Sequence, residues 1–209
     1  MFVPQPYAIA KYREHRKRLD VRKGVIELFT YLERLGYLSC PASHSHHNSC
    51  EGGLLDHSIC VTDVLLALRR AVWNDLDLAN KGNLSVDSCI FVGLVHDVGK
   101  LGVPGRPYYI KDAKAASGYD YNNNNHPPVY MEHSQRSLLI VSHFVDLAAW
   151  EAQAIVGHDG QYISANIGMR NRETPLTLLL HFADMWSASQ IEQTYSIPNS
   201  DIFQFQEEF

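Results

Sequence analysis

The stretch Cys89–Lys100, CIFVGLVHDVGK, decides the fold and the chemistry of this chain. Its apolar run Ile90–Val95 predicts a buried helix, and this helix ends in the adjacent pair His96 and Asp97. A buried carboxylate without compensation is costly, so it requires a cation or several hydrogen-bond donors. A divalent metal bound by neutral imidazole and carboxylate meets that requirement. The stretch therefore predicts a pair of metal ligands at the end of a core helix.

Other polar residues interrupt apolar segments in the same way: His57 in GGLLDH, His133 in MEHSQRS, His158 in AIVGHDGQ and Asp184 in LLLHFADMWSA. One histidine in such a segment is more often a core or capping residue than a ligand, so each is ambiguous alone. Their joint pattern is less ambiguous, because helical bundles build metal sites by pointing one ligand inward from each of several helices. The dispersed set predicts a metal-dependent enzyme.

Length and composition fit a single globular domain of 209 residues, 45% hydrophobic and 20% charged, with a core that needs no disulfides. The net charge of -5 argues against a broad nucleic-acid-binding surface, which is usually basic. The four cysteines form no CxxC pair and are interpreted as free thiols in a reducing compartment. The N-terminus does not resemble a signal peptide, and no apolar run approaches the roughly 18 residues of a membrane span. We expect a cytoplasmic protein that does not enter a membrane.

Helical spacing of apolar residues predicts an all-α bundle, with helices at about 19–35, 54–73, 86–98, 132–147, 149–158 and 174–191. No stretch shows sustained two-residue alternation, so no sheet is expected. Residues 1–18 are expected to form an N-terminal arm, extended over 1–10 because of its prolines and basic over 11–18. The basic part is either a phosphate-binding arm or a solvated helix face. Residues 102–130 form a long insert, a kind of segment that is usually functional or disordered.

The order His…His-Asp…Asp resembles the HD superfamily of metal-dependent phosphohydrolases. The resemblance covers about residues 40–192, within a single HD-type domain, and is carried by HNSCEGGLLDHS, VGLVHDVGK, EHSQRS, AIVGHDGQ and ETPLTLLLHFADMWSA. The first two segments are most similar to the branch that contains HD-domain 3′–5′ exoribonucleases and related bacterial and phage proteins. The resemblance implies a helical bundle with the metal site between core helices.

The resemblance also implies which residues bind metal. His57, His96, Asp97 and Asp184 match the four ligands of a first ion, and His133 and His158 match the extra histidines of two-metal members, with Asp97 as the bridge. The chain departs from the branch twice: it has His47-Asn48 where two histidines are common, and His158-Asp159 where a His-His pair is common. Aspartate is still a competent ligand.

Substrate contacts are expected beside these ligands. In the family, the lysine matched by Lys100 lies near substrate phosphate; alternatively, Lys100 is a lysine at a helix C-terminus, favoured by the helix dipole. In the insert, Arg106, Lys111 and Lys114 can add phosphate contacts, and Tyr108 and Tyr109 can stack on a base, or the insert is an ordinary surface loop.

A second group of soft ligands occurs upstream, namely Cys40, His44, His46, His47 and Cys50. Its spacing matches no familiar zinc pattern. A separate zinc site is therefore the minority interpretation, and His47 is expected to approach the catalytic site from its edge. His181, three residues before Asp184, is expected to be a core residue or to support a ligand.

The expected function is hydrolysis of a phosphoester of a nucleotide or nucleotide-like compound. One or two divalent ions of Mn, Fe, Co, Ni or Zn would activate a hydroxide that attacks phosphorus, with Asp97 and Lys100 as catalytic residues. The alternatives are a nuclease that acts on oligonucleotide ends, a metal-binding regulatory module without turnover and, more remotely, a di-iron oxygenase.

Overall fold

The computed structural model describes residues 6–122 and 131–192, and these ranges are mostly helical, which confirms the all-α fold class. The α-helices are α1 (Pro6–Leu19), α2 (Val25–Arg34), α3 (Gly53–Val72), α4 (Leu78–Gly82), α5 (Val86–Val95), α6 (His133–Ser142), α7 (Ala149–Gly157) and α8 (Pro175–Trp186). Short helical turns join them: η1 (Trp73–Asp75), η2 (Val98–Leu101), η4 (Gly160–Tyr162), η5 (Ser164–Met169) and the π-helical η6 (Ser187–Ile191). Within the described ranges, no helix combines the length and apolar character of a membrane span.

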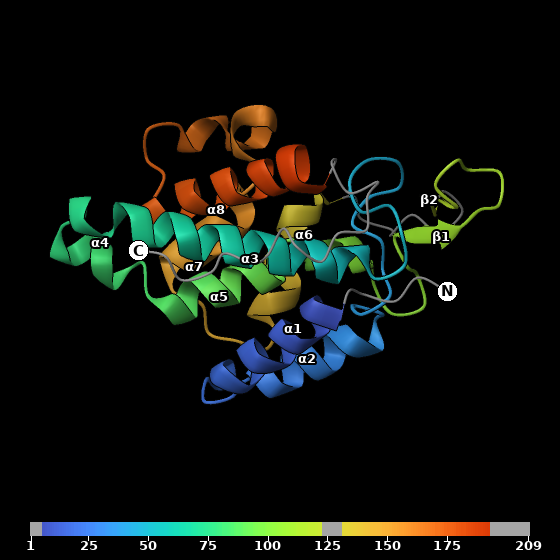
Figure 1. Ribbon diagram of the computed structural model, residues 1–209, viewed down its shortest axis with the longest axis horizontal. Helices are drawn as coiled ribbons and strands as arrows, with labels where there is room; N and C mark the ends of the chain where they lie inside the picture. The colour runs from blue at the N-terminus through green and yellow to red at the C-terminus, as the bar shows by residue number, and fades with distance from the viewer. Residues whose placement is uncertain (1–5, 123–130, 193–209) are drawn as a thin grey trace.

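Helix α3 lies at the centre of the bundle, packed against α1, α5 and α8, while α7 packs against α6 and α8 (Figure 1). Helix α5 is buried on every side from Cys89 to Val95, as expected for a helix without a polar face. A Cβ at Gly93 would lie 2.4 Å from Oγ1 of Thr62 on α3. This glycine therefore allows α3 and α5 to approach closely and brings their polar residues together.

A second close approach joins the turn η2 to α6. A Cβ at Gly99 would lie 2.0 Å from the carbonyl oxygen of His133. The Gly99 amide donates to Oγ of Ser137 at 2.8 Å, and its carbonyl accepts from Nη1 of Arg136 at 3.0 Å. The backbone after Asp97 is thus fixed to the start of α6, where His133 is the first residue.

The prediction of an extended segment is wrong over residues 6–10, because α1 begins at Pro6; residues 1–5 lie outside the described ranges. Proline is well tolerated in the first helical turn, where its missing N–H has no partner to lose. The helix is held by burial of Ala8, Tyr12 and Leu19. The basic segment 11–18 is therefore part of a helix, as the helix-face interpretation expected.

The helix predicted over 19–35 is interrupted, and α2 begins only at Val25. Gly24 has a φ of 84°, and a Cβ there would lie 1.9 Å from the carbonyl oxygen of Phe144. The break therefore lets the chain turn against the segment that follows α6. Helical spacing alone did not reveal it, because apolar residues continue on both sides.

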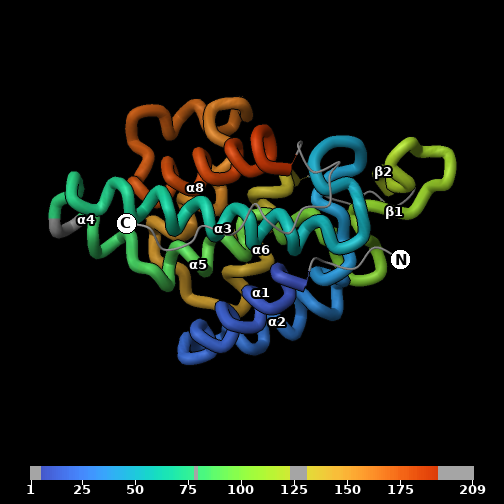
Figure 2. Tube along the Cα trace, in the orientation of Figure 1, coloured from blue at the N-terminus to red at the C-terminus, as the bar shows by residue number. Residues whose placement is uncertain are grey.

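The predicted insert contains a short antiparallel hairpin, β1 (Tyr109–Lys111) and β2 (Tyr119–Tyr121), with Tyr109 opposite Tyr121. Three-residue strands are too short for an alternation signal, so the sequence did not predict them. The hairpin lies beside the loop 36–52 (Figure 2), where the ring centroids of His44 and Tyr121 are 4.3 Å apart. Residues 123–130 of the insert, and the tail from Ser196, lie outside the described ranges.

Candidate metal centre

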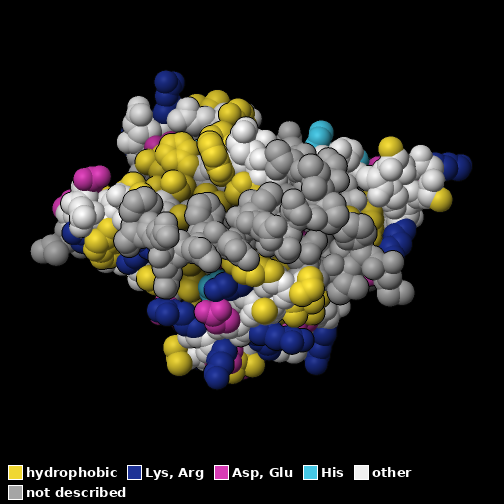
Figure 3. Space-filling view, viewed as in Figure 1, with side chains coloured by type: hydrophobic (Ala, Val, Ile, Leu, Met, Phe, Trp, Pro, Cys, Tyr) yellow, Lys and Arg dark blue, Asp and Glu magenta, His cyan; other side chains and the backbone are white. Residues whose placement is uncertain are grey.

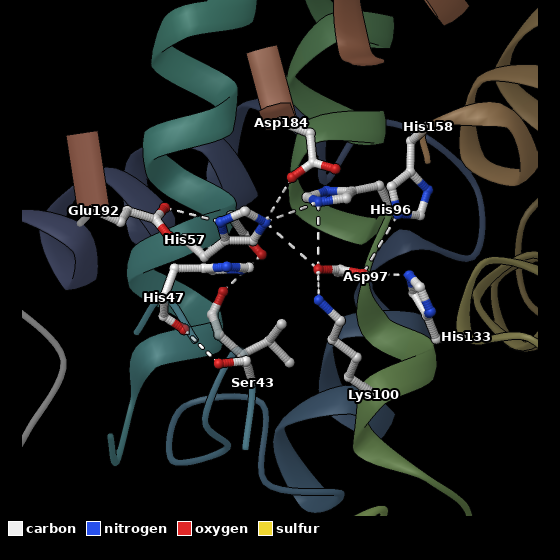
Figure 4. Close-up of polar contacts among 12 residues, drawn as sticks. Ser43, His47, His57, His96, Asp97, Lys100, His133, His158, Asp184 and Glu192 are labelled. Carbon is white, nitrogen blue, oxygen red and sulfur yellow. Dashed lines mark hydrogen bonds and ion pairs between the residues drawn. The ribbon is translucent and has the colours of Figure 1, made fainter. Parts of the chain in front are cut away.

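The four residues predicted to hold a first ion converge at one point (Figure 4). Nε2 of His57, on α3, lies 3.2 Å from Oδ1 of Asp184 on α8, 3.3 Å from Nε2 of His96 and 3.5 Å from Oδ2 of Asp97. Two ligands bonded to one ion at about 2.1 Å are themselves about 3.0–3.4 Å apart in octahedral or tetrahedral geometry. Three of them, His57, His96 and Asp97, form a group with the spacing of metal ligands. Asp184 lies beside this group and forms another one with His96 and His158.

A second group faces the other oxygen of Asp97. Oδ1 of Asp97 lies 3.4 Å from Nε2 of His133 and 3.5 Å from Nε2 of His158. Asp159 joins this group, with Oδ1 3.3 Å from Nε2 of His133. Asp97 thus stands between two sets of donors with one oxygen toward each, and Asp159 occupies the position where the resembling branch often has a histidine.

The histidine tautomers are fixed by acceptors behind the rings. Nδ1 lies 2.8 Å from a Glu192 carboxylate oxygen in His57, 2.9 Å from the Gly93 carbonyl in His96 and 2.7 Å from the Ile155 carbonyl in His158. An ionised carboxylate or a carbonyl only accepts, so each Nδ1 carries the proton. Each Nε2 is then directed at the site, as in metal-binding histidines whose other nitrogen donates to an outer acceptor.

Several polar atoms of the site lack a partner in the described part of the chain, and a bound cation would provide one. Among the described residues, Oδ1 of Asp97 and Oδ2 of Asp159 are buried without a hydrogen-bond partner. Nε2 of His57 and Nε2 of His96 face each other across 3.3 Å. In their neutral forms these two nitrogens would point lone pairs at each other, so a proton or a metal ion is needed between them. The donor set fits one or two divalent ions.

Electrostatics in the protein favour positive charge at this point. Burial opposes protonation of His57, but the carboxylates of Glu192 and Asp184 outweigh it and raise its pKa to about 10. His158 behaves alike: burial is outweighed by Asp159 and Asp97, and its pKa rises to about 9. His96 is the exception, because burial lowers its pKa to about 4 and keeps the ring neutral.

Asp97 and Lys100 form a close ion pair, with Nζ of Lys100 2.5 Å from Oδ2 of Asp97. Burial opposes ionisation of Asp97, but Lys100 and the surrounding histidines prevail and hold its pKa well below the usual range. Burial likewise opposes the charge on Lys100, and Asp97 more than compensates, so the pKa of the ammonium is raised. The carboxylate is ionised and ready to bind a cation, and the lysine is charged.

Four side chains give the site an open face. Lys100, Asp159, Asp184 and His133 keep between 13% and 21% of their side-chain surface exposed, whereas His57 and His96 keep none. A bound ion would therefore lie against the buried histidines and be approached from the side of these four residues.

Glu192 is a site residue that sequence reasoning missed, because it follows the last predicted helix and no apolar segment contains it. It is 8% exposed and accepts from His57. His47 approaches from the edge as expected, its ring centroid 4.8 Å from that of His57.

The rest of the upstream group lies apart from the site. Of its five members, only His47 belongs to a cluster with metal-binding geometry among the described residues. His44 instead packs against Tyr121 and His46, and the thiol of Cys40 lies 3.7 Å from the Lys100 carbonyl oxygen. Nδ1 of His181 donates to the His158 carbonyl at 2.7 Å, so His181 supports a ligand as predicted.

The predicted substrate contacts of the insert differ in their exposure to solvent. Tyr109 is 8% exposed, so in this structure its ring is not available for stacking on a base. Lys111 is exposed and lies 3.2 Å from Glu51, and Arg106 is exposed on the turn before the hairpin. Lys100 is the one member of the predicted substrate set that touches the metal centre, through Asp97. The roles of Arg106, Lys111 and Tyr109 stay predictions.

Comparison with known proteins adds no relative: no family model, curated protein or solved structure matches the chain.

Proposed function

We propose that this chain is a metal-dependent phosphohydrolase of the HD superfamily that cleaves a phosphoester of a nucleotide or nucleotide-like compound. The observation that carries the proposal is the placement of Asp97. Its two oxygens face two separate groups of imidazole and carboxylate donors, and one of them also accepts from the Lys100 ammonium at 2.5 Å. A bridging carboxylate beside a cationic side chain suits chemistry on an anionic group such as a phosphoester.

Each residue has a role derived from its position. From the pairwise distances, His57, His96 and Asp184 would hold the first ion and His133, His158 and Asp159 the second, with Asp97 between them. When bound, divalent ions supply Lewis acidity: they make water more acidic and neutralise negative charge on a phosphoryl group. The carbonyls of Gly93 and Ile155 orient the imidazoles of His96 and His158.

Lys100 is proposed to neutralise charge that develops on the phosphoryl oxygens. Its side chain lies at the open face and is 13% exposed, so a bound anion could reach it. Because its pKa is raised, chiefly by Asp97 against the effect of burial, it stays charged while it contacts substrate. A charged donor held in a partly buried site contributes more than the same donor in water.

Ion identity is proposed from donor chemistry. Histidine nitrogens with carboxylate oxygens suit Mn, Fe, Co, Ni or Zn, and less well Mg or Ca, which prefer oxygen alone. The four cysteines are free thiols in the structure, which supports the proposed cytoplasmic location in a reducing compartment.

The test is elemental analysis of the purified protein followed by an activity screen. The metal-loaded protein would be assayed on nucleoside monophosphates, cyclic nucleotides, short oligonucleotides and the chromogenic ester bis(p-nitrophenyl) phosphate. Hydrolysis that depends on added metal and is lost in Asp97→Ala is the expected result. A protein that retains less than one ion per chain under saturating Mn, Co and Zn would refute the proposal.

A nuclease that acts on oligonucleotide ends is the nearest rival. The basic segment 11–18 favours a nuclease, but three of its positive side chains pair with acidic side chains of α1, α2 and α5. Lys11 pairs with Glu14, Arg16 with Glu33 and Arg18 with Asp87. Figure 3 shows Lys and Arg side chains interspersed with acidic ones over α1 and α2. A nuclease that tracks several phosphates should lose activity steeply with salt, whereas a small-substrate enzyme should not.

Two other rivals make different predictions in the same screen. A regulatory module would bind the metal and a nucleotide without turnover. A di-iron oxygenase would consume oxygen when loaded with iron, and would be inactive with Mn or Zn. Lys100, poised at the open face beside Asp97, favours the phosphohydrolase over both.

A further inference from the structure

We infer that Glu192 is a positioning residue of the metal centre: it holds the His57 imidazole in the tautomer and orientation that metal binding requires. The inference rests on the proposed metal site, and it assigns a role to a residue outside every motif of the sequence. Glu192 accepts from Nδ1 of His57 at 2.8 Å, while Asp184 lies 3.2 Å from Nε2 of the same ring. One helical segment thus contacts both nitrogens of one buried histidine (Figure 4).

The π-helical turn η6 makes this double contact possible. Glu192 follows Asp184 by eight residues, which at 3.6 residues per turn places it about 80° around the helix axis. The amide of Glu192 donates to the Ser187 carbonyl, a bond over five residues that marks the wider π turn. At about 4.4 residues per turn, five residues remove roughly 90° and return Glu192 to the face of Asp184. The turn therefore aligns the two carboxylates toward His57.

The pair is buried enough for the contact to govern His57. His57 is fully buried and Glu192 is 8% exposed. A carboxylate that accepts from Nδ1 keeps the proton there, leaves Nε2 free as a ligand and makes that nitrogen more basic. The other described ligand histidines with a fixed Nδ1, His96 and His158, use backbone carbonyls, so Glu192 gives His57 the one charged acceptor among these three.

A different assignment of the same atoms is a separate cation bound by His47, His57 and Glu192, whose ligand atoms lie within 4.8 Å of one another. Nε2 of His47 and Oε2 of Glu192 are buried without a hydrogen-bond partner among the described residues. Such an ion would have to take Nδ1 of His57, while Nε2 already faces Asp97, Asp184 and His96. An imidazole with metal at both nitrogens must lose both protons. The positioning role needs no such step.

The experiment is equilibrium binding of Co²⁺ to metal-free protein, followed by the visible absorption of the bound ion. Wild type is compared with Glu192→Ala and Glu192→Gln. Loss of an outer carboxylate partner lowers metal affinity about 10- to 100-fold, so this rise in Kd is expected for Glu192→Ala, with a changed cobalt spectrum. Glu192→Gln should fall between the two, because its amide oxygen still accepts from Nδ1 but carries no charge.

The control is Glu151→Gln, which changes an equally buried glutamate that pairs with Arg22 away from the centre. It should lower the unfolding temperature of the metal-free protein and leave the cobalt Kd and spectrum unchanged. A wild-type Kd and spectrum in Glu192→Ala would overturn the inference, as would a third equivalent of cobalt that disappears in His47→Ala. If wild type and Asp97→Ala bind cobalt alike, it is instead the proposed function that fails.

Discussion

Nζ of Lys100 lies 2.5 Å from Oδ2 of Asp97, the same oxygen that faces His57 and His96. The contact spans three residues, because η2 follows Asp97 directly and turns the lysine back over the carboxylate. An ion held by His57, His96 and Asp97 would therefore share this oxygen with the Lys100 ammonium. An anion that reached such an ion from the open face would meet the ammonium as well, so metal binding and substrate contact can be tested with separate substitutions.

Asp97→Ala should abolish metal retention. The substitution removes the carboxylate that both donor groups face, and it leaves the Lys100 ammonium beside the remaining histidines, where its charge repels a cation. Elemental analysis after dialysis should show well below one ion per chain. Asp87→Ala removes an exposed carboxylate that pairs with Arg18, and it should retain the wild-type metal content. Equal metal content in both variants would show that Asp97 is no ligand.

Lys100→Ala should retain the metal and lose turnover. The ammonium acts on the phosphoryl group, and a lost hydrogen bond to a charged group is worth about 1.5–3 kcal/mol, so kcat should fall roughly tenfold to a hundredfold. Steady-state kinetics on the best phosphoester from the screen measures the loss, with metal content determined on the same sample. Lys23→Ala changes an exposed lysine between α1 and α2 and serves as the comparison. Undiminished kcat in Lys100→Ala would refute the phosphate role.

His133→Ala should reduce the metal content from two ions per chain to one. His133 contacts Asp159 and the oxygen of Asp97 that faces away from His57 and His96, and its partial exposure means that truncation leaves no core cavity. His143→Ala, at the other end of α6, removes an exposed imidazole and should keep both ions. If wild type saturated with Mn never exceeds one ion, the centre is mononuclear.

Removal of metal should lower the unfolding temperature. A ligand held at about 100 times its Kd stabilises the folded state by about 2.7 kcal/mol. For a domain of this size, 1 kcal/mol corresponds to about 2–4 °C, so a chelator should lower Tm by roughly 5–11 °C. Calorimetry with and without EDTA measures the shift, and Asp97→Ala, which holds no metal, should show none.

The candidate ligands on apolar segments could be predicted from the sequence, whereas the contact of Glu192 with His57 could not. His96 and Asp97 stand out because a buried carboxylate in an apolar run needs compensation, and the same logic applies to His57 and Asp184. Glu192 has no such signal. Its approach to His57 depends on a π turn, which residue periodicity does not specify.

The fold likewise has parts that the sequence predicts and parts that it does not. Long apolar patterns located the helices of the core, including α3 and α5, because burial imposes the helical period on them. The break at Gly24 depends on a contact with Phe144, which is distant in sequence. The hairpin at Tyr109 depends on contacts with the loop around His44, which is also distant. Tertiary contacts of this kind leave only a weak local trace in the sequence.

Gly99→Ala should destabilise the protein and weaken the second metal position at once. Its methyl group would lie 2.0 Å from the His133 carbonyl oxygen and 2.9 Å from the Ser137 amide, both backbone atoms that cannot move away alone. The start of α6 must therefore shift away from η2, which displaces His133 from Asp97. Overpacking of this kind costs about 1–3 kcal/mol, measured by urea unfolding of the metal-free protein. Gly82→Ala, on the surface helix α4 with no neighbour within 4 Å of the added carbon, should cost nothing and keep both ions. If Gly99→Ala is as stable as wild type and binds two ions, the contact between η2 and α6 does not position His133.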